Sequence, residues 1–126
     1  MKVIPPMAIN GVYVGNSRGD LATYEKWLGA PAEMIHSFVG GASWADFTGS
    51  VKWSTGSVWN GRTEDVMWSV PLILYNGQTS LAAAGRGDYD TYYKQVAQTL
   101  LASRKGDSDP IYVRTGWEFN GDWFTW

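Results

Sequence analysis

The chain has 126 residues, the usual size of one domain, and its lack of cysteine excludes a disulfide framework and any thiolate metal site. Its formal net charge of -2 at pH 7 provides no basic surface for nucleic acid or anionic membranes, and no apolar run approaches the roughly 20 residues that cross a bilayer. We therefore expect one structural unit over residues 1–126, with no cofactor, no metal and neither nucleic acid nor a membrane as partner. Residues 1–6 lack the apolar core of a signal peptide, and composition does not decide the localisation.

Aromatic residues are in excess. Eight Trp, seven Tyr and four Phe make up 15% of the chain, more than a small core requires. Because the C–H faces of sugars stack on aromatic rings, a surplus of Trp beside Asn, Asp and Glu suggests a carbohydrate ligand. For any single Trp, packing in the core is still the more common role.

The first elements in chain order are a strand and a helix. The apolar, β-prone segment Ala8–Val14 predicts the first strand. Asp20 is then expected to cap a helix that ends at Gly29, the residue type that most easily adopts the left-handed conformation. Its apolar face has the spacing i, i+3 and i+7: Leu21, Tyr24 and Leu28.

A second strand and a long connection come next. Met34–Val39 predicts the strand. The stretch Gly40–Trp68 is rich in Gly, Ser, Thr and Trp, and we interpret it as a long loop followed by a short helix at Thr63–Trp68.

The third strand is expected at Val70–Tyr75, and the clearest helix of the chain follows it. Asp88 precedes the helix, and Arg104–Gly106 close it. Its apolar residues recur with helical spacing: Tyr89, Tyr92, Tyr93, Val96 and Leu100.

The fourth strand is expected at Ile111–Val113, running on toward Glu118. Near-continuous apolar runs that alternate with helices predict an α/β fold with a parallel sheet buried on both faces. A (β/α)8 barrel takes about 250 residues, so four βα units with the last helix missing correspond to half of a TIM-type barrel. A flavodoxin-like open sheet is the structural alternative, but it needs a fifth strand or a final covering helix. The open first and fourth edges of a half barrel also predict a homodimer.

The sharpest functional signal lies at the C-terminus. If the last strand stays extended, Tyr112, Arg114, Gly116 and Glu118 share one face that can point into a barrel. Glu118 then lies at the carboxyl end of its strand, where barrel enzymes place catalytic groups, with the positive charge of Arg114 nearby. A structural ion pair between Glu118 and Arg114 is the alternative, and Asn120–Asp122 have the composition of an ordinary turn.

The segment Arg114–Trp126 resembles the fourth-strand motif of glycoside hydrolase family 26, the β-mannanase family of retaining (β/α)8 enzymes. That motif reads Arg-Pro-x-His-Glu-x-Asn-Gly-x-Trp-Phe-x-Trp, and seven positions match in register: Arg114, Glu118, Asn120, Gly121, Trp123, Phe124 and Trp126. The resemblance implies an endo-acting glycoside hydrolase with Glu118 as general acid/base. It also implies sugar contacts for Asn120, Trp123 and Trp126. Members of the family are usually secreted.

Two positions depart from the motif. Thr115 replaces the proline, and Trp117 replaces the histidine that commonly contacts substrate in the family. Trp117 still offers an indole N–H or a stacking face. The expected substrate is therefore a β-mannan or a related β-glycan or exopolysaccharide.

A retaining glycosidase needs a second carboxylate as nucleophile, which the family carries on its seventh strand. The four strands expected here include no such residue. The other acids near loops lack a comparable motif: Asp46, Asp65, Asp88 and Asp90. We therefore expect the chain alone to be inactive.

Four further residues follow the expected strands on the same rim as Glu118 and are candidate sugar-binding residues: Asn16, Trp44, Tyr75 and Asn76. Turn formation explains the two asparagines equally well. His36 is the only histidine, and a core or interface role is favoured over a catalytic one. Two other functions are compatible with the composition: a non-catalytic carbohydrate-binding module and a self-assembling half-barrel scaffold.

Overall fold

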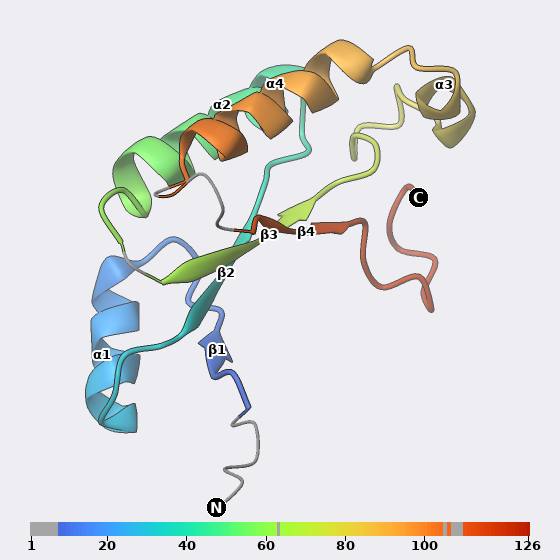
Figure 1. Ribbon diagram of the computed structural model, residues 1–126. Coiled ribbons are helices and arrows are strands. Elements are labelled where there is room, and N and C mark those ends of the chain that lie inside the picture. Colours follow the sequence, from blue (N-terminus) through green and yellow to red (C-terminus); the bar gives the residue numbers. More distant parts are fainter. Residues whose placement is uncertain (1–7, 63, 105, 107–109) are drawn as a thin grey trace, which may run out of the picture.

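The fold is built on a sheet of four parallel strands (Figure 1). A computed structural model describes residues 8–62, 64–104, 106 and 110–126. The strands are β1 (Gly11–Val12), β2 (Met34–Phe38), β3 (Asp65–Val70) and β4 (Tyr112–Thr115). This arrangement confirms the predicted α/β class with a parallel sheet.

Neighbouring strands in the sheet are also neighbours in the sequence. The order is β1-β2-β3-β4, so each strand pairs with the strand before it in the chain. A flavodoxin-like sheet instead reverses its strand order once, at a switch point. No such reversal occurs among the described strands, which argues against the flavodoxin-like alternative.

Helices fill the connections between the strands. They are α1 (Arg18–Leu28), α2 (Trp44–Trp53), which continues into a π-helical turn η1 (Ser54–Val58), α3 (Leu81–Gly85) and α4 (Asp90–Ala102). Helices α2 and α4 lie side by side over one face of the sheet (Figure 1). No helix of the described part is long and apolar enough to cross a membrane.

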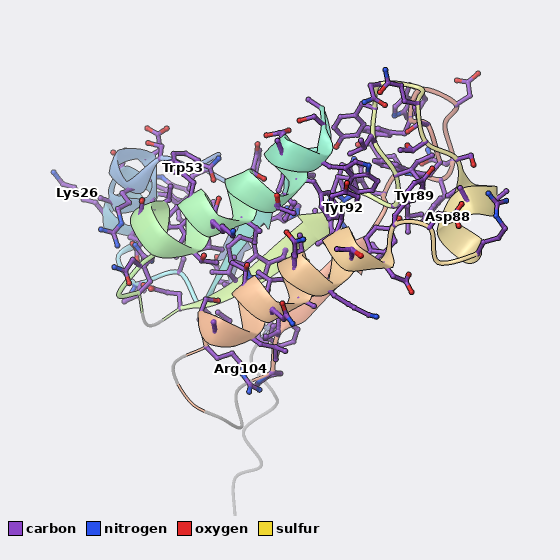
Figure 2. All side chains as sticks on the ribbon, turned by 90° about the horizontal axis from the view of Figure 1, so that it is seen from above. Lys26, Trp53, Asp88, Tyr89, Tyr92 and Arg104 are labelled. Atoms are coloured by element: carbon purple, nitrogen blue, oxygen red, sulfur yellow. The ribbon has the colours of Figure 1, made fainter. Side chains whose placement is uncertain are left out.

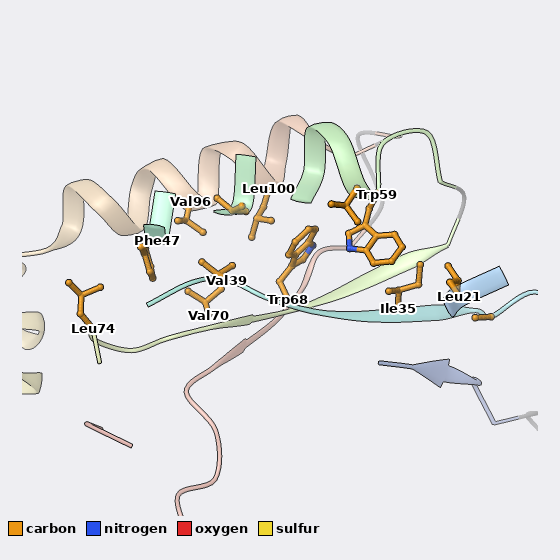
Figure 3. Close-up of a cluster of buried hydrophobic side chains, with 13 residues drawn as sticks. Leu21, Ile35, Val39, Phe47, Trp59, Trp68, Val70, Leu74, Val96 and Leu100 are labelled. Atoms are coloured by element: carbon orange, nitrogen blue, oxygen red, sulfur yellow. The ribbon is translucent and has the colours of Figure 1, made fainter. Parts of the chain in front are cut away.

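The hydrophobic core lies between these helices and the sheet (Figure 3). Ile35 of β2 and Trp68 of β3 project into it from the sheet, while Phe47 of α2 and Leu100 of α4 close it from the helix side. The strand register aligns Ser37 with Trp68 and Trp68 with Val113. The neighbouring row, Phe38, Ser69 and Arg114, therefore lies on the face turned away from these helices.

The prediction for the third strand is wrong in position. The strand spans Asp65–Val70, whereas Val70–Tyr75 was expected, and this strand takes residues 65–68 of the short helix expected at Thr63–Trp68. Pro71 has no N–H to donate, which explains why the ladder ends there. Ile73 and Leu74 are buried, but by packing outside the sheet. Burial alone made this stretch look like a strand.

The expected long loop after β2 is also wrong, because most of it is helical. Ser43 caps α2 by accepting a hydrogen bond at its Oγ from the Asp46 backbone N–H (3.0 Å). Phe47 and Val51, spaced i and i+4, are then buried on one face. The helix was not predicted because Gly49 and several Ser and Thr residues in this stretch have low intrinsic helix propensity. Tertiary packing outweighs that propensity here.

The helix ends were predicted with mixed success. Gly29 ends α1 in the left-handed conformation, with φ of 76°, as expected. The cap of α1 is Ser17, not Asp20, because the Ser17 Oγ accepts from the Asp20 N–H (3.0 Å). Helix α4 begins at Asp90, two residues after the expected cap Asp88. The short helix α3 was not predicted.

Two strands are shorter than predicted. Strand β1 covers only two residues of the expected Ala8–Val14. Strand β4 ends at Thr115, and Gly116 then turns the chain with a φ of +64°. A Cβ at Gly116 would also lie 2.8 Å from the Leu72 side chain, so glycine is favoured at this turn.

Both outer strands of the described sheet have one open edge. Strand β1 pairs only with β2, and β4 only with β3. All four residues of β4 are exposed, and an apolar groove of about 330 Å³ lies beside it, with Leu72, Val96 and Val113 in its lining. An exposed strand edge next to an apolar groove favours association with another chain.

We therefore expect the purified chain to self-associate. Light scattering after size-exclusion chromatography at micromolar concentration should give about twice the 14.0 kDa of one chain. Val113→Lys places a charge at the open edge and should restore a monomer. Leu101→Lys, on the exposed surface of α4, should leave the dimer intact. A compact wild-type monomer would contradict the prediction.

Candidate active site

The segment that follows β4, residues 116–126, lies beyond the carboxyl ends of the strands (Figure 1). Two hydrogen bonds fasten it. The Thr125 hydroxyl donates to the Leu74 carbonyl (2.9 Å), and the Trp126 indole N–H donates to the Trp117 carbonyl (2.9 Å). The segment thereby folds back over the end of the sheet. This is the edge of a parallel sheet at which α/β enzymes bind ligands.

Four aromatic rings form a cluster within this region, and we call them the aromatic cluster: Tyr75, Trp117, Phe124 and Trp126. Phe124 and Trp126 stack with their ring centroids 4.7 Å apart, and Trp117 meets Trp126 edge-on at 4.8 Å. Tyr75 packs against Trp126 at 5.7 Å. Burial, with a further contribution from the negative charge of Asp46, raises the pKa of Tyr75 above its ordinary value. The Tyr75 phenol is therefore neutral at neutral pH.

Three polar side chains lie beside this cluster on the face of the sheet that is turned away from α2 and α4. We call them the polar row: His36, Ser69 and Arg114. The Arg114 Nε donates to the Ser69 Oγ (2.9 Å), and the same hydroxyl lies 2.6 Å from the His36 Nε2. The Arg114 guanidinium also lies over the rings of Phe38 (5.7 Å) and Trp117 (5.6 Å). The three polar side chains come from three adjacent strands, so the sheet register itself brings them together.

Glu118 does not share the strand face of Arg114. The strand ends at Thr115, and Glu118 itself has a φ of +53°, in the left-handed region that non-glycine residues rarely adopt. Such backbone strain is found preferentially at functional sites. The carboxylate is exposed, and no ion pair with Arg114 occurs among the described residues. Arg114 hydrogen-bonds to Ser69 instead.

Trp123 holds the Glu118 carboxylate. Its indole N–H donates to the Glu118 Oε2 (2.6 Å), while 62% of the Trp123 side chain is exposed. A turn closed by the Gly121 N–H and the Glu118 carbonyl (3.1 Å) brings the two residues together. A side chain at Gly121 would collide with the Trp123 ring, which explains the glycine at this position. An exposed ring and an exposed carboxylate thus lie next to each other.

The remaining candidate residues have more varied surroundings. Trp44 stacks on Tyr92 of α4, with ring centroids 4.2 Å apart, and also contacts Tyr89. Figure 2 shows Tyr92 and Tyr89 close together near the start of α4. One face of the Trp44 ring is therefore covered by α4. Asn16 is exposed and lies 3.4 Å from the Ser37 hydroxyl. Asn76 caps a turn by accepting from the Gln78 N–H (3.0 Å).

Asn120 is exposed and lies in the turn that begins at Glu118. Sequence reasoning missed Ser69 and Phe38, because their role depends on the register between β2, β3 and β4. Placing the third strand at Val70–Tyr75 put Ser69 outside the sheet. A correct strand assignment would have set Phe38, Ser69 and Arg114 in one row.

Comparisons of the chain with protein-family models, with curated protein sequences and with solved structures gave no match. The described residues include no group of three His, Cys, Asp or Glu side chains that could hold a metal ion. The chemistry available at the C-terminal segment is a carboxyl that can exchange a proton, beside aromatic rings and an amide side chain.

Proposed function

We propose that this chain is the N-terminal half of a (β/α)8 barrel from a retaining, endo-acting glycoside hydrolase, with Glu118 as general acid/base. The proposed substrate is a β-linked polysaccharide such as a β-mannan or a related β-glycan. The observation that carries the proposal is the contact between the Glu118 carboxylate and the indole of Trp123, beyond the carboxyl ends of parallel strands. Both residues belong to the motif on which the resemblance rests.

The sheet supports the half-barrel part of the proposal. A (β/α)8 barrel consists of strands in sequential order with helices on the outer face, and β1 to β4 follow that order. The face turned away from α2 and α4 carries His36, Ser69 and Arg114. In a closed barrel this face would point to the interior.

The proposed chemistry uses Glu118 twice. In the first step its carboxyl gives a proton to the glycosidic oxygen, the bond from that oxygen to the anomeric carbon breaks, and a second carboxylate, the nucleophile, forms a bond to the anomeric carbon. In the second step the resulting Glu118 carboxylate takes a proton from the water that attacks the anomeric carbon, and the bond to the nucleophile breaks. The nucleophile must lie about 5 to 5.5 Å away in a retaining enzyme. Asp46 is engaged in a hydrogen bond from the Ala42 N–H (3.1 Å), so we do not assign it this role.

The proposal predicts that Trp123 is a sugar platform. Trp123→Ala should weaken binding of the chain to a soluble β-mannan or β-glucan by up to about tenfold, since an aromatic contact contributes about 0.5 to 1.5 kcal/mol. Affinity electrophoresis in gels that contain the polysaccharide measures this change. The matched control is Trp27→Ala on α1, which removes a ring that is 78% exposed and lies outside the C-terminal segment. Equal effects of the two substitutions would argue against a platform at Trp123.

A non-catalytic carbohydrate-binding role is the second candidate. It is favoured by exposed rings at Phe119 (69%) and Trp123 (62%) in a segment where we assign no nucleophile. The two functions differ in their products. Binding without release of reducing ends, even in a longer chain that adds a seventh-strand carboxylate, would favour the binding role.

A further inference from the structure

The hydrogen bonds of the polar row have a defined direction. A guanidinium only donates, so the Ser69 Oγ accepts from the Arg114 Nε (2.9 Å). The Ser69 hydroxyl hydrogen is then available for the His36 Nε2, 2.6 Å away. We assign Nε2 the accepting role because the Arg114 Nη2, which can only donate, also lies 3.4 Å from it. The imidazole is then neutral, with its proton on Nδ1. The chain of donation therefore runs from Arg114 through Ser69 to His36.

A charged imidazole disturbs this arrangement. Once His36 gains a proton, its Nε2 becomes a donor and no longer accepts from Ser69. Ser69 is fully buried, so its hydroxyl hydrogen would lose its acceptor where water does not reach. The Arg114 Nη2 lies 3.4 Å from the same Nε2, which would bring two cationic donors face to face. Protonation therefore favours displacement of Arg114.

Among the described residues, the groups that face His36 carry no compensating negative charge. Tyr13, the residue after β1, faces the imidazole with ring centroids 5.6 Å apart, Ser69 faces it from β3, and Arg114 faces it from β4. Among the described residues no carboxylate forms an ion pair with His36. Burial and, to a smaller extent, the positive charge of Arg114 lower the pKa of His36 below its ordinary value of 6.5.

Arg114 in turn supports the C-terminal segment through Trp117. Its guanidinium lies over the Trp117 ring, which is 6% exposed and meets Phe38 edge-on at 5.1 Å. The backbone carbonyl of Trp117 accepts from the Trp126 indole, and its ring contacts Phe124 at 5.5 Å. Displacing Arg114 would therefore remove the guanidinium that lies over the face of the Trp117 ring, and Trp117 contacts two other members of the aromatic cluster.

We propose that Arg114, Ser69 and His36 form a pH-sensitive clamp that fixes the aromatic cluster while His36 is neutral and releases it when His36 becomes charged. The clamp is a property of the fold and does not depend on the proposed hydrolase activity. It makes His36 and Ser69 positioning residues for the C-terminal segment.

A titration of the purified chain tests the clamp. Because His36 is the only histidine, the imidazole signals in an NMR titration from pH 8 to pH 5 report this residue alone. We expect the Trp126 indole N–H resonance, assigned by its loss in Trp126→Phe, to shift with the same midpoint as the imidazole. The near-ultraviolet circular dichroism of the cluster should weaken over the same range, while the far-ultraviolet signal persists.

His36→Gln is the matched variant, since its amide oxygen can accept from Ser69 and carries no charge at any pH. We expect its near-ultraviolet signal to stay constant from pH 8 to pH 5. Ser69→Ala, which removes the hydroxyl that bridges Arg114 and His36, should show the weakened signal already at pH 8. An imidazole that titrates without any change at Trp126, or that stays neutral down to pH 5, would overturn the proposal even if both variants failed to fold.

The same clamp has a consequence for stability. The pKa of His36 is lowered in the folded state, so the unfolded chain binds more protons as the pH falls through about 6.5. The free energy of unfolding, measured in urea, should therefore decrease below this pH. His36→Gln should remove that part of the decrease, and an unchanged pH dependence in the variant would contradict the assignment.

Discussion

Glu118→Ala should lower glycosidase turnover by about 10²- to 10⁴-fold in a longer chain that carries this segment together with a seventh-strand carboxylate, because that is the usual contribution of a general acid. The fold should be unaffected, since the Glu118 side chain is exposed and its hydrogen bond goes to Trp123, a ring that is itself largely exposed. Turnover is measured as the release of reducing ends from an unactivated β-glycan.

Asp122→Asn is the matched control for this substitution. Asp122 is an exposed acid four residues further along the same segment, and no hydrogen bond or ion pair engages its side chain in the described part of the chain. We expect near-normal turnover from it. If Glu118→Ala retained normal turnover, or if Asp122→Asn lost as much activity, the acid/base role of Glu118 would have to be given up.

The isolated 126-residue chain should show no hydrolysis of mannan, glucan or xylan above background. The retaining mechanism requires two carboxyl groups, and the motif supplies only Glu118. Reducing-end assays on the purified protein check this expectation, and the Glu118→Ala variant of the same chain separates genuine turnover from a contaminating hydrolase. Activity that depends on Glu118 would mean that a second copy, or another local acid, supplies the nucleophile.

The fold class could be predicted from the sequence because it depends on patterns of burial. The apolar run of β2 and the left-handed stop of α1 at Gly29 were placed correctly, since each depends on local chemistry. Helix α2 was missed, because its stability comes from burying Phe47 and Val51 and not from intrinsic helix propensity. The third strand was predicted too far along the chain for a different reason. Ile73 and Leu74 are buried but do not belong to a strand, so their apolar pattern was misleading.

The candidate site was predictable only where one contiguous segment forms it. The resemblance of residues 114–126 to a known motif identified Glu118, Trp123 and Trp126 together. The polar row could not be found in this way, because His36, Ser69 and Arg114 are far apart in the sequence and meet only through the strand register. The left-handed conformation of Glu118 likewise has no signal in its residue type.

The sequential strand order also bears on how the chain folds during synthesis. Each strand pairs with the one made just before it, so none has to wait for a partner that the ribosome has not yet produced. The sheet can therefore grow one strand at a time from its N-terminal side. Arg114 belongs to β4, and its contacts with Ser69 and His36 can form only after β2 and β3 are in place. Among the described elements, the segment proposed to act on sugars is thus made after the strands that position it.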